Sequence, residues 1–304
     1  MRITIRALMA TGAGALAFGV AACVDDDRPA TAPPPAATTA VKVLALQIGG
    51  SAQRPTLTAP ASSPAGLTRI QVTTTAKTRI NGVQILRFDA GRTARQALTE
   101  AEAWASESKP LPPWIHLEGG VTALDTKPTS VSTRVLPAGS YVAFGVDDDE
   151  ATKAGSPREP SAAFQVTPDS RGGELPAPAA QVTMKEYAFE ARGLTAGRQQ
   201  LLVDNVGKEP HFIVGLPLKP GRTVADARAY YAPAARRPAV PEPVDLKRSF
   251  NTAILDGGSQ QVVDVDLDEG AYVFLCFVPD RAGGPVHVAK GMISAVTVRP
   301  RRPR

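Results

Sequence analysis

An ordered internal repeat is the feature of this sequence that most constrains its fold. Four short motifs of the first half return in the second half, in the same order and roughly 130 residues later. Such self-similarity is typical of a chain that contains two copies of one structural unit, so we expect two domains of the same fold. The motif pairs are Gly-Leu-Thr at 66–68 and 193–195, Gly-Arg-Thr at 91–93 and 221–223, Leu-Glu-Gly-Gly at 117–120 with Leu-Asp-Gly-Gly at 255–258, and Leu-x-x-Gly-x-Tyr-Val at 136–142 and 267–273.

Short β-prone runs recur along both halves. The 26 Gly and 28 Pro residues supply the turns that many short strands require. The predicted fold class is all-β, with two Greek-key β-sandwich domains in tandem. Strands are expected at 41–48, 70–75, 81–88 and 161–166 in the first half, at 181–190, 199–205, 211–218 and 292–298 in the second, and around Tyr141 and Tyr272.

One helical stretch interrupts the strands of each half. The first covers residues 94–106, and the second follows Thr223 and is cut short by Pro233. Thr93 and Thr223 are expected N-caps, because a threonine hydroxyl can accept a hydrogen bond from a free backbone N–H of the first turn. Each sandwich should therefore carry a short helical excursion. The expected domains are residues 41–168 and 181–299, joined by a Pro- and Gly-rich linker at 169–180.

The first 40 residues have the composition of an export and anchoring segment. The uncharged run from 7 to 22 follows a basic start and is shorter than the about 20 residues that cross a bilayer. Its end, Val20-Ala21-Ala22-Cys23, resembles the bacterial lipobox. This resemblance implies that residues 1–22 are a signal peptide and that Cys23 receives a lipid. A plain signal peptide with an accidental cysteine remains the alternative.

Residues 23–40 are rich in Asp, Pro, Ala and Thr, a mixture that buries too little apolar surface to fold. We interpret them as a disordered spacer between the lipid and the folded part. The expected localisation is the cell envelope, with the exported chain anchored to a membrane by lipid. Although the net charge is +5, several basic residues lie in the signal and in the tail at 299–304, so no nucleic-acid partner is predicted.

Residues that commonly bind metals are scarce after Cys23, and their placement is informative. They comprise three histidines, two methionines and a single cysteine. A lone thiol in an oxidising compartment cannot form an internal disulfide, so it is either buried and inert or used as a ligand. The histidines are His116, His211 and His287, the methionines Met184 and Met292, and the cysteine Cys276.

Four of these residues follow a recognisable order in the second half. His211 begins a β-prone run, Cys276 ends a later one, and His287 precedes Met292 by five positions. This pattern resembles that of the cupredoxins, the blue copper proteins. The resemblance covers 181–299 and implies a cupredoxin-like fold and one copper ion, held in a type 1-like site by His211, Cys276, His287 and Met292. Thiolate, imidazole and thioether ligands together suit both oxidation states of copper.

Two departures from the family pattern are visible. Residues 277–286 form a longer loop between Cys276 and His287 than small cupredoxins have, and this loop is more similar to that of the copper domains of nitrite reductases. The first half carries no copper ligands at the corresponding positions, so it is interpreted as a degenerate copy that serves as a structural partner or docking surface. Those positions are Asn81, Gly145, Arg158, Glu159 and Ala163.

The remaining candidate features predict no chemistry. His116 is expected to be a loop histidine, and the acidic run at 147–150 a solvated turn, because it lacks the spacing of a calcium loop. The sequence contains neither a nucleophile elbow nor a Walker-type loop, which argues against a hydrolase or a nucleotide-dependent enzyme.

Two functions from different classes stay open at this point. The first is an envelope lipoprotein whose copper site serves one-electron transfer or copper handling, together with a redox or copper-exchange partner protein. The second is a metal-free tandem β-sandwich that binds a protein partner or the cell wall, with Cys276 as an ordinary buried cysteine. An oxidoreductase with its own substrate is disfavoured, since no second cofactor site is apparent.

Overall fold

The computed structural model describes residues 41–75, 78, 80–124, 128–147, 160–169, 172–232 and 241–301. The expected signal peptide, Cys23 and spacer lie outside these residues, as does most of the acidic run at 147–150. No helix within the described ranges is long and apolar enough to cross a membrane.

In the first half, two sheets face each other. Leu44 and Ile70 from one sheet share a buried core with Ile85, Tyr141 and Phe164 from the other. The first sheet contributes β1 (Lys42–Gly50), β2 (Pro55–Thr58), β4 (Gly66–Thr74) and β7 (Thr129–Leu136), and the second contains β3 (Ser62–Pro64), β5 (Ile80–Phe88), β6 (Ile115–Val121), β8 (Gly139–Asp147) and β9 (Ser161–Thr167).

The strands of the second half pair in a matching way. β10 (Ala180–Lys185) pairs parallel with β12 (Gly197–Asn205), as β1 does with β4. The third strand of each group, β15 (Ser259–Leu267) or β7, then pairs antiparallel with β12 or β4. A four-stranded sheet packs against this group, so the prediction of an all-β sandwich fold is confirmed. The strands are β10 (Ala180–Lys185), β11 (Ala188–Arg192), β12 (Gly197–Asn205) and β15 (Ser259–Leu267), facing β13 (Val214–Pro217), β14 (Phe250–Asn251), β16 (Gly270–Leu275) and β17 (Ile293–Val298).

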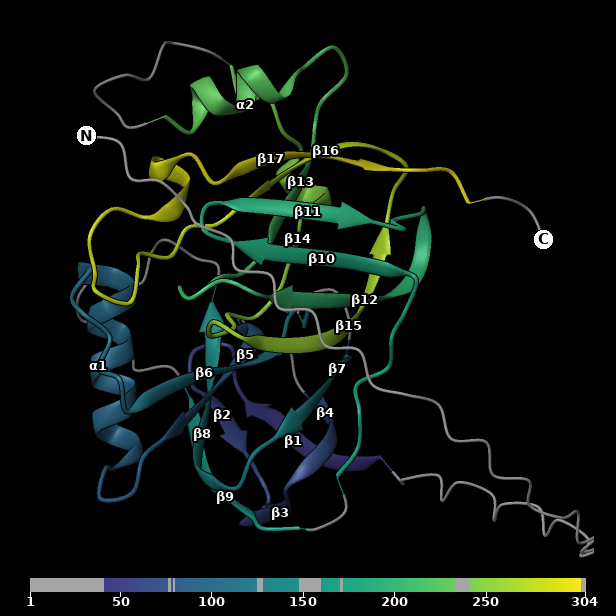
Figure 1. The fold of residues 1–304 in the computed structure, drawn as a ribbon. Helices are drawn as coiled ribbons and strands as arrows, with labels where there is room; N and C mark the ends of the chain where they lie inside the picture. Colours follow the sequence, from purple (N-terminus) through teal and green to yellow (C-terminus); the bar gives the residue numbers. More distant parts are fainter. Residues whose placement is uncertain are drawn as a thin grey trace, which may run out of the picture. The chain divides into compact units, whose positions relative to one another are not determined.

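One sheet runs through both halves. Its order is β11-β10-β12-β15-β7-β4-β1-β2, and the central contact is the antiparallel pair of β15 with β7 (Figure 1). Two separate sandwiches would not require this pairing. Because the strands join edge to edge, the first half contributes backbone and side chains directly to the surroundings of the second.

Three local expectations need correction. The expected strand at 181–190 is a hairpin, because the chain reverses at Tyr187, whose φ is 32°. The expected strand at 211–218 is shorter, since β13 begins at Val214 and His211 forms an isolated bridge with Leu255. His116 is not in a loop: it lies on β6 and its Nε2 is 3.0 Å from Asp89 Oδ1.

Both expected helices are present and begin as predicted. They are α1 (Ala94–Glu107) and α2 (Val224–Tyr230). The hydroxyl of Thr93 accepts from Gln96 N, and that of Thr223 accepts from Asp226 N, so each threonine forms a capping box. Trp104 of α1 is almost fully buried and joins the core of the second half. This helix therefore belongs to the first half in sequence but packs against both.

A buried ionic cluster lies where the halves meet. Glu118 of β6 is 3% exposed and accepts from Arg87 Nε at 2.8 Å and from Arg134 Nε at 3.0 Å. Arg134 also donates to Gln260 O at 3.0 Å and to Ser259 Oγ at 3.2 Å, both at the start of β15. The cluster thus links both halves across the shared sheet.

Candidate metal centre

A short irregular segment before β13 places His211. The amide of Asn205, at the end of β12, donates to Glu209 O at 2.8 Å and to Leu255 O at 3.0 Å. His211 N donates to Leu255 O at 3.0 Å, and Leu255 N returns a bond to His211 O at 2.9 Å. A buried asparagine can satisfy several backbone groups at once. These hydrogen bonds therefore fix the backbone of His211 without the help of a bound ligand.

The end of β16 and the turn before β17 place the other two residues. Cys276 directly follows β16, and His287 begins a short 3-10 turn, His287–Lys290. Backbone bonds close the long loop between them: His287 N donates to Val278 O at 2.9 Å, and Val288 N donates to Cys276 O at 2.7 Å. These two bonds bring the loop ends together and set the thiol beside the imidazole.

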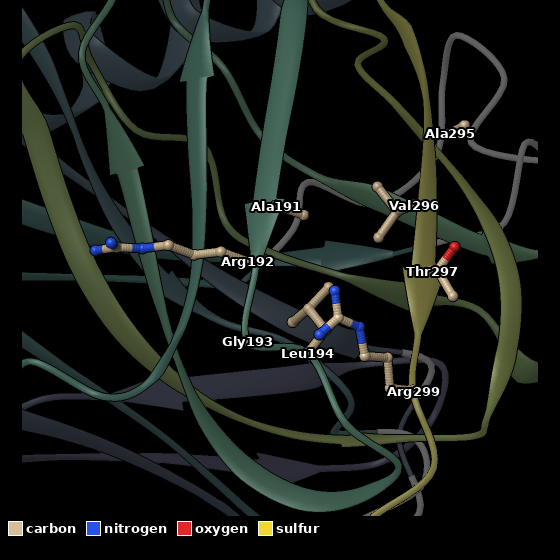
Figure 2. Close-up of a pocket in the computed structure, with 8 residues that line it drawn as sticks. All are labelled: Ala191, Arg192, Gly193, Leu194, Ala295, Val296, Thr297 and Arg299. Atoms are coloured by element: carbon tan, nitrogen blue, oxygen red, sulfur yellow. The ribbon is translucent and has the colours of Figure 1, made fainter.

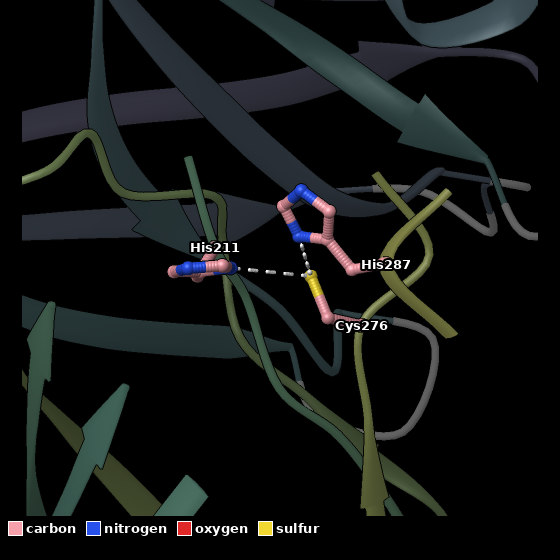
Figure 3. A group of neighbouring side chains, drawn as sticks. All are labelled: His211, Cys276 and His287. Atoms are coloured by element: carbon pink, nitrogen blue, oxygen red, sulfur yellow. Dashed lines mark hydrogen bonds between the residues drawn. The ribbon is translucent and has the colours of Figure 1, made fainter. Parts of the chain in front are cut away.

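His211, Cys276 and His287 converge at one point (Figure 3). Cys276 Sγ lies 3.4 Å from His287 Nδ1 and 3.9 Å from His211 Nδ1. The three potential ligand atoms lie within 4.8 Å of one another, and all three side chains have 0% exposure. Both imidazoles therefore present the same nitrogen, Nδ1, to the thiol sulfur.

Burial sets the protonation of this group. It lowers the pKa of His211 to about 4, with the neighbouring His287 adding to the effect, and it also lowers the pKa of His287. Burial raises the pKa of the Cys276 thiol to about 12, although the backbone N–H groups of Phe212 and Val278 oppose this. At neutral pH both imidazoles are uncharged, as metal ligands must be, and the thiol keeps its proton until a cation displaces it.

An unsatisfied atom distinguishes His211 from an ordinary core histidine. Its Nε2 is buried and has no hydrogen-bond partner among the described residues. A buried polar atom without a partner costs about 1–3 kcal/mol, so packing alone does not favour an imidazole here, and an ion held at Nδ1 would leave Nε2 unpaired as well. Two neutral imidazoles and one soft sulfur donor form a ligand set that suits copper. The residues present therefore fit a copper ion.

Met292 is the fourth residue that the sequence suggested. It is fully buried immediately before β17, and its backbone N–H donates to His287 O at 2.9 Å. The convergent group consists of the two histidines and the cysteine and does not depend on Met292. Its role as a fourth ligand stays a prediction.

No second group of three His, Cys, Asp or Glu side chains converges as a possible metal site in the described part of the chain. Asn81 and Gly145 of the first half lie on β5 and β8, and Ala163 lies on β9. Arg158 and Glu159 fall outside the described residues. His116, which lies on β6, pairs with Asp89 and takes no part in the cluster.

Three residues beside the cluster were not identified from the sequence. Asp280 Oδ1 accepts from His287 Nε2 at 2.9 Å and from Tyr187 OH at 3.0 Å, and Asp280 Oδ2 pairs with Lys290. The imidazole of His287 lies edge-on to the Tyr187 ring, with centroids 5.2 Å apart. Asp280 is the only acidic residue between Cys276 and His287, which is the one signal that could have found it.

The loop that carries Asp280 rests on the first half (Figure 1). Trp104 Nε1 of α1 donates to Asp280 O at 2.8 Å, and Leu111 N donates to Arg281 O at 2.7 Å. The Arg281 guanidinium donates to the carbonyl oxygens of Pro112 and Ile115, at 3.0 and 3.1 Å. The first half thus contacts this loop directly, while its role as a structural partner stays a prediction.

A surface pocket between β11 and β17 is separate from the cluster. It is lined by residues 191–194, 295–297 and Arg299, and Figure 2 shows the Arg299 side chain extending toward Leu194. None of the three convergent residues lines it. The metal candidate is therefore a compact buried group of ligands and not an open ligand cleft.

No protein-family model and no curated protein matches this chain. Solved structures similar to it include reduced auracyanin from the photosynthetic bacterium Roseiflexus castenholzii, at 24% identity over 40% of this chain and 95% of that one, with a TM-score of 0.26. Auracyanin B matches at 22% identity over 42% and 94%, with a TM-score of 0.27, and a multicopper oxidase at 10% identity over 78% and 83%, with a TM-score of 0.22. Because these TM-scores are low, the site is assigned from this chain's own side chains.

Proposed function

We propose that this chain is a copper-binding protein of the cell envelope, with a cupredoxin-like second half that serves one-electron transfer or copper handling. The observation that carries the proposal is the buried convergence of Cys276 Sγ with the Nδ1 atoms of His211 and His287. Met292 would be a fourth, weaker ligand. A redox or copper-exchange protein would be its partner.

The chain's own residues prepare this site for a metal. The two imidazoles are neutral because they are buried, and the loop bonds at Val278 and Cys276 hold the ligands close before any ion arrives. The thiol releases its proton on binding, while the N–H groups of Phe212 and Val278 favour the thiolate. A copper ion held there would supply one-electron chemistry, since it alternates between a monovalent and a divalent state.

Visible spectroscopy tests the copper site. One equivalent of divalent copper added to the purified chain should produce an intense thiolate-to-copper charge-transfer band, because a thiolate lies among the ligands. Cys276→Ser should abolish the band, and Met292→Leu should alter its position or intensity while keeping it. A wild-type chain that shows neither the band nor tight copper binding would leave the metal-free binding module as the better description.

We further propose that the chain is an exported lipoprotein, with Cys23 lipidated, residues 1–22 removed, and 23–40 as the spacer. The two halves are proposed to be copies of one unit, of which the first has lost its ligands. This proposal rests on the lipobox-like sequence, the four repeated motifs and the matching strand pairing.

Substitution of Cys23 tests the lipid anchor. In Cys23→Ala, expressed in a bacterium that processes lipoproteins, the chain should leave the membrane fraction, because one thiol provides the attachment for the lipid. Cys276→Ala is the matched control and should remain in the membrane fraction. Membrane association that survives in Cys23→Ala would contradict lipid anchoring at this residue.

A further inference from the structure

The two ring nitrogens of His287 face different partners. Nδ1 points at Cys276 Sγ, 3.4 Å away, while Nε2 is 2.9 Å from Asp280 Oδ1. A carboxylate can only accept a hydrogen bond, so the proton of the neutral imidazole lies on Nε2. The lone pair on Nδ1 is then free for a metal. The loop thereby selects the tautomer that the site requires.

Three donors surround the Asp280 carboxylate. Its Oδ1 accepts from Tyr187 OH at 3.0 Å and from His287 Nε2 at 2.9 Å, and its Oδ2 pairs with the ammonium group of Lys290. Lys290 also donates to Tyr187 OH at 3.0 Å and lies over the Tyr187 ring, 4.9 Å from its centroid. The carboxylate is therefore fixed from three sides, and its orientation toward His287 does not depend on one contact.

The position of Asp280 depends on contacts made by the first half. Residues 280–283 form a tight turn, in which Gly283 N donates to Asp280 O at 2.8 Å. Gly283 has a φ of +85°, and a Cβ there would lie 2.2 Å from Ser108 O at the end of α1. The same carbonyl of Asp280 accepts from Trp104 Nε1. The turn therefore fits against α1 only when residue 283 is a glycine.

We propose that Asp280 is the positioning residue of the metal centre, and that the first half fixes it by holding the 277–286 loop against α1. This inference rests on the proposed function, because it assigns a role toward the same metal ion. It gives the ligand-free half a function: this half sets the orientation of His287. Carboxylate partners of this kind orient a ligand imidazole and make it a better donor.

Substitution of Asp280 tests the first part. In the metal-free wild type, nitrogen-15 NMR should show the His287 proton on Nε2, and Asp280→Ala should yield a mixture of tautomers. Copper affinity should fall about 10- to 100-fold in Asp280→Ala. It should fall less in Asp280→Asn, whose amide oxygen can still accept the bond. Asp266→Asn is the control, because Asp266 pairs with Arg198 on an exposed part of the second half and touches neither the loop nor an imidazole.

Two neighbouring glycines test the second part. Both Gly283 and Gly284 have positive φ, but a Cβ on Gly284 would meet nothing within 4 Å. Alanine therefore adds similar backbone strain at either position, and only Gly283→Ala clashes with α1. Gly283→Ala should lose copper affinity and the single tautomer to the extent of Asp280→Ala, whereas Gly284→Ala should stay much closer to wild type.

The outcomes separate this inference from the proposed function. A single Nε2–H tautomer and wild-type copper affinity in Asp280→Ala would overturn the role of Asp280. Equal behaviour of the two glycine variants would overturn the role of α1. If the wild type fails to bind copper, the proposed function fails, while the tautomer measurement on the metal-free chain still decides whether Asp280 orients His287.

Discussion

Saturating copper should stabilise this chain against unfolding, and His211→Leu should abolish that gain while changing the stability of the metal-free protein much less. A ligand present at about a thousandfold above its dissociation constant stabilises the state that binds it by about 4 kcal/mol. The ligand atoms converge only in the folded chain, because His211 and Cys276 are far apart in sequence. The unfolded chain should therefore compete poorly for the metal.

The expected stability of the metal-free variant follows from the unpaired nitrogen of His211. Its Nε2 is buried without a hydrogen-bond partner in the part of the chain that the structure covers. The desolvation cost of this nitrogen therefore lowers the stability of the metal-free protein. Leucine is of similar size and carries no polar atom. The free energy of unfolding of metal-free His211→Leu should stay within about 1.5 kcal/mol of wild type.

Urea denaturation with and without copper measures both the stabilisation by copper and the stability of the metal-free protein. His116→Leu is the matched control, since His116 lies on β6, pairs with Asp89 and is outside the cluster. This control should keep the full stabilisation by copper. A copper gain that persists in His211→Leu would remove His211 from the ligand set, and a large loss of stability without metal would make it a structural histidine.

Local sequence patterns predicted the elements that depend on neighbouring residues. Thr93 and Thr223 cap their helices as expected, because a capping box requires only residues within one turn. The convergence of His211, Cys276 and His287 was also predictable, since a family resemblance carries information about long-range contacts that composition lacks. The reversal at Tyr187 was missed, because a β-prone run contains no glycine or proline there.

Features that depend on contact between the halves could not be predicted. β15 and β7 join the two halves in one sheet, but neither strand has a sequence pattern that distinguishes it from an ordinary edge strand of its own half. Asp280 was interpreted only as part of a loop, because its contacts with His287 and Trp104 require the 277–286 loop to fold back on α1. Likewise, nothing in the sequence around Glu118 indicates that it pairs with Arg87 and Arg134 in the protein interior.

Glu118→Gln should destabilise the chain by about 3–5 kcal/mol, because it leaves the buried guanidinium of Arg134 without an anion. The Arg134 side chain is 6% exposed and that of Glu118 is 4% exposed, so water cannot replace the lost partner. Glu190→Gln is the control: its pair with Lys185 is exposed on the surface, and such pairs contribute about 0–1 kcal/mol. Equal effects of the two substitutions, measured by urea denaturation at neutral pH, would contradict a stabilising role for the buried cluster.

The same substitution predicts a pH dependence with a definite sign. Burial by itself raises the pKa of Glu118, but the charge of Arg134, the charge of Arg87 and their hydrogen bonds outweigh it, so the pKa lies below its ordinary value of 4.5. The folded state therefore binds this proton more weakly than the unfolded chain does. The stability that Glu118 contributes is fully present above its unfolded pKa and is lost as the pH falls toward the folded pKa. The difference in unfolding free energy between wild type and Glu118→Gln should accordingly stay constant near neutral pH and shrink below about pH 4.5. A difference that persists undiminished in acid would show that Glu118 acts there through its shape and hydrogen bonds, and not through its charge.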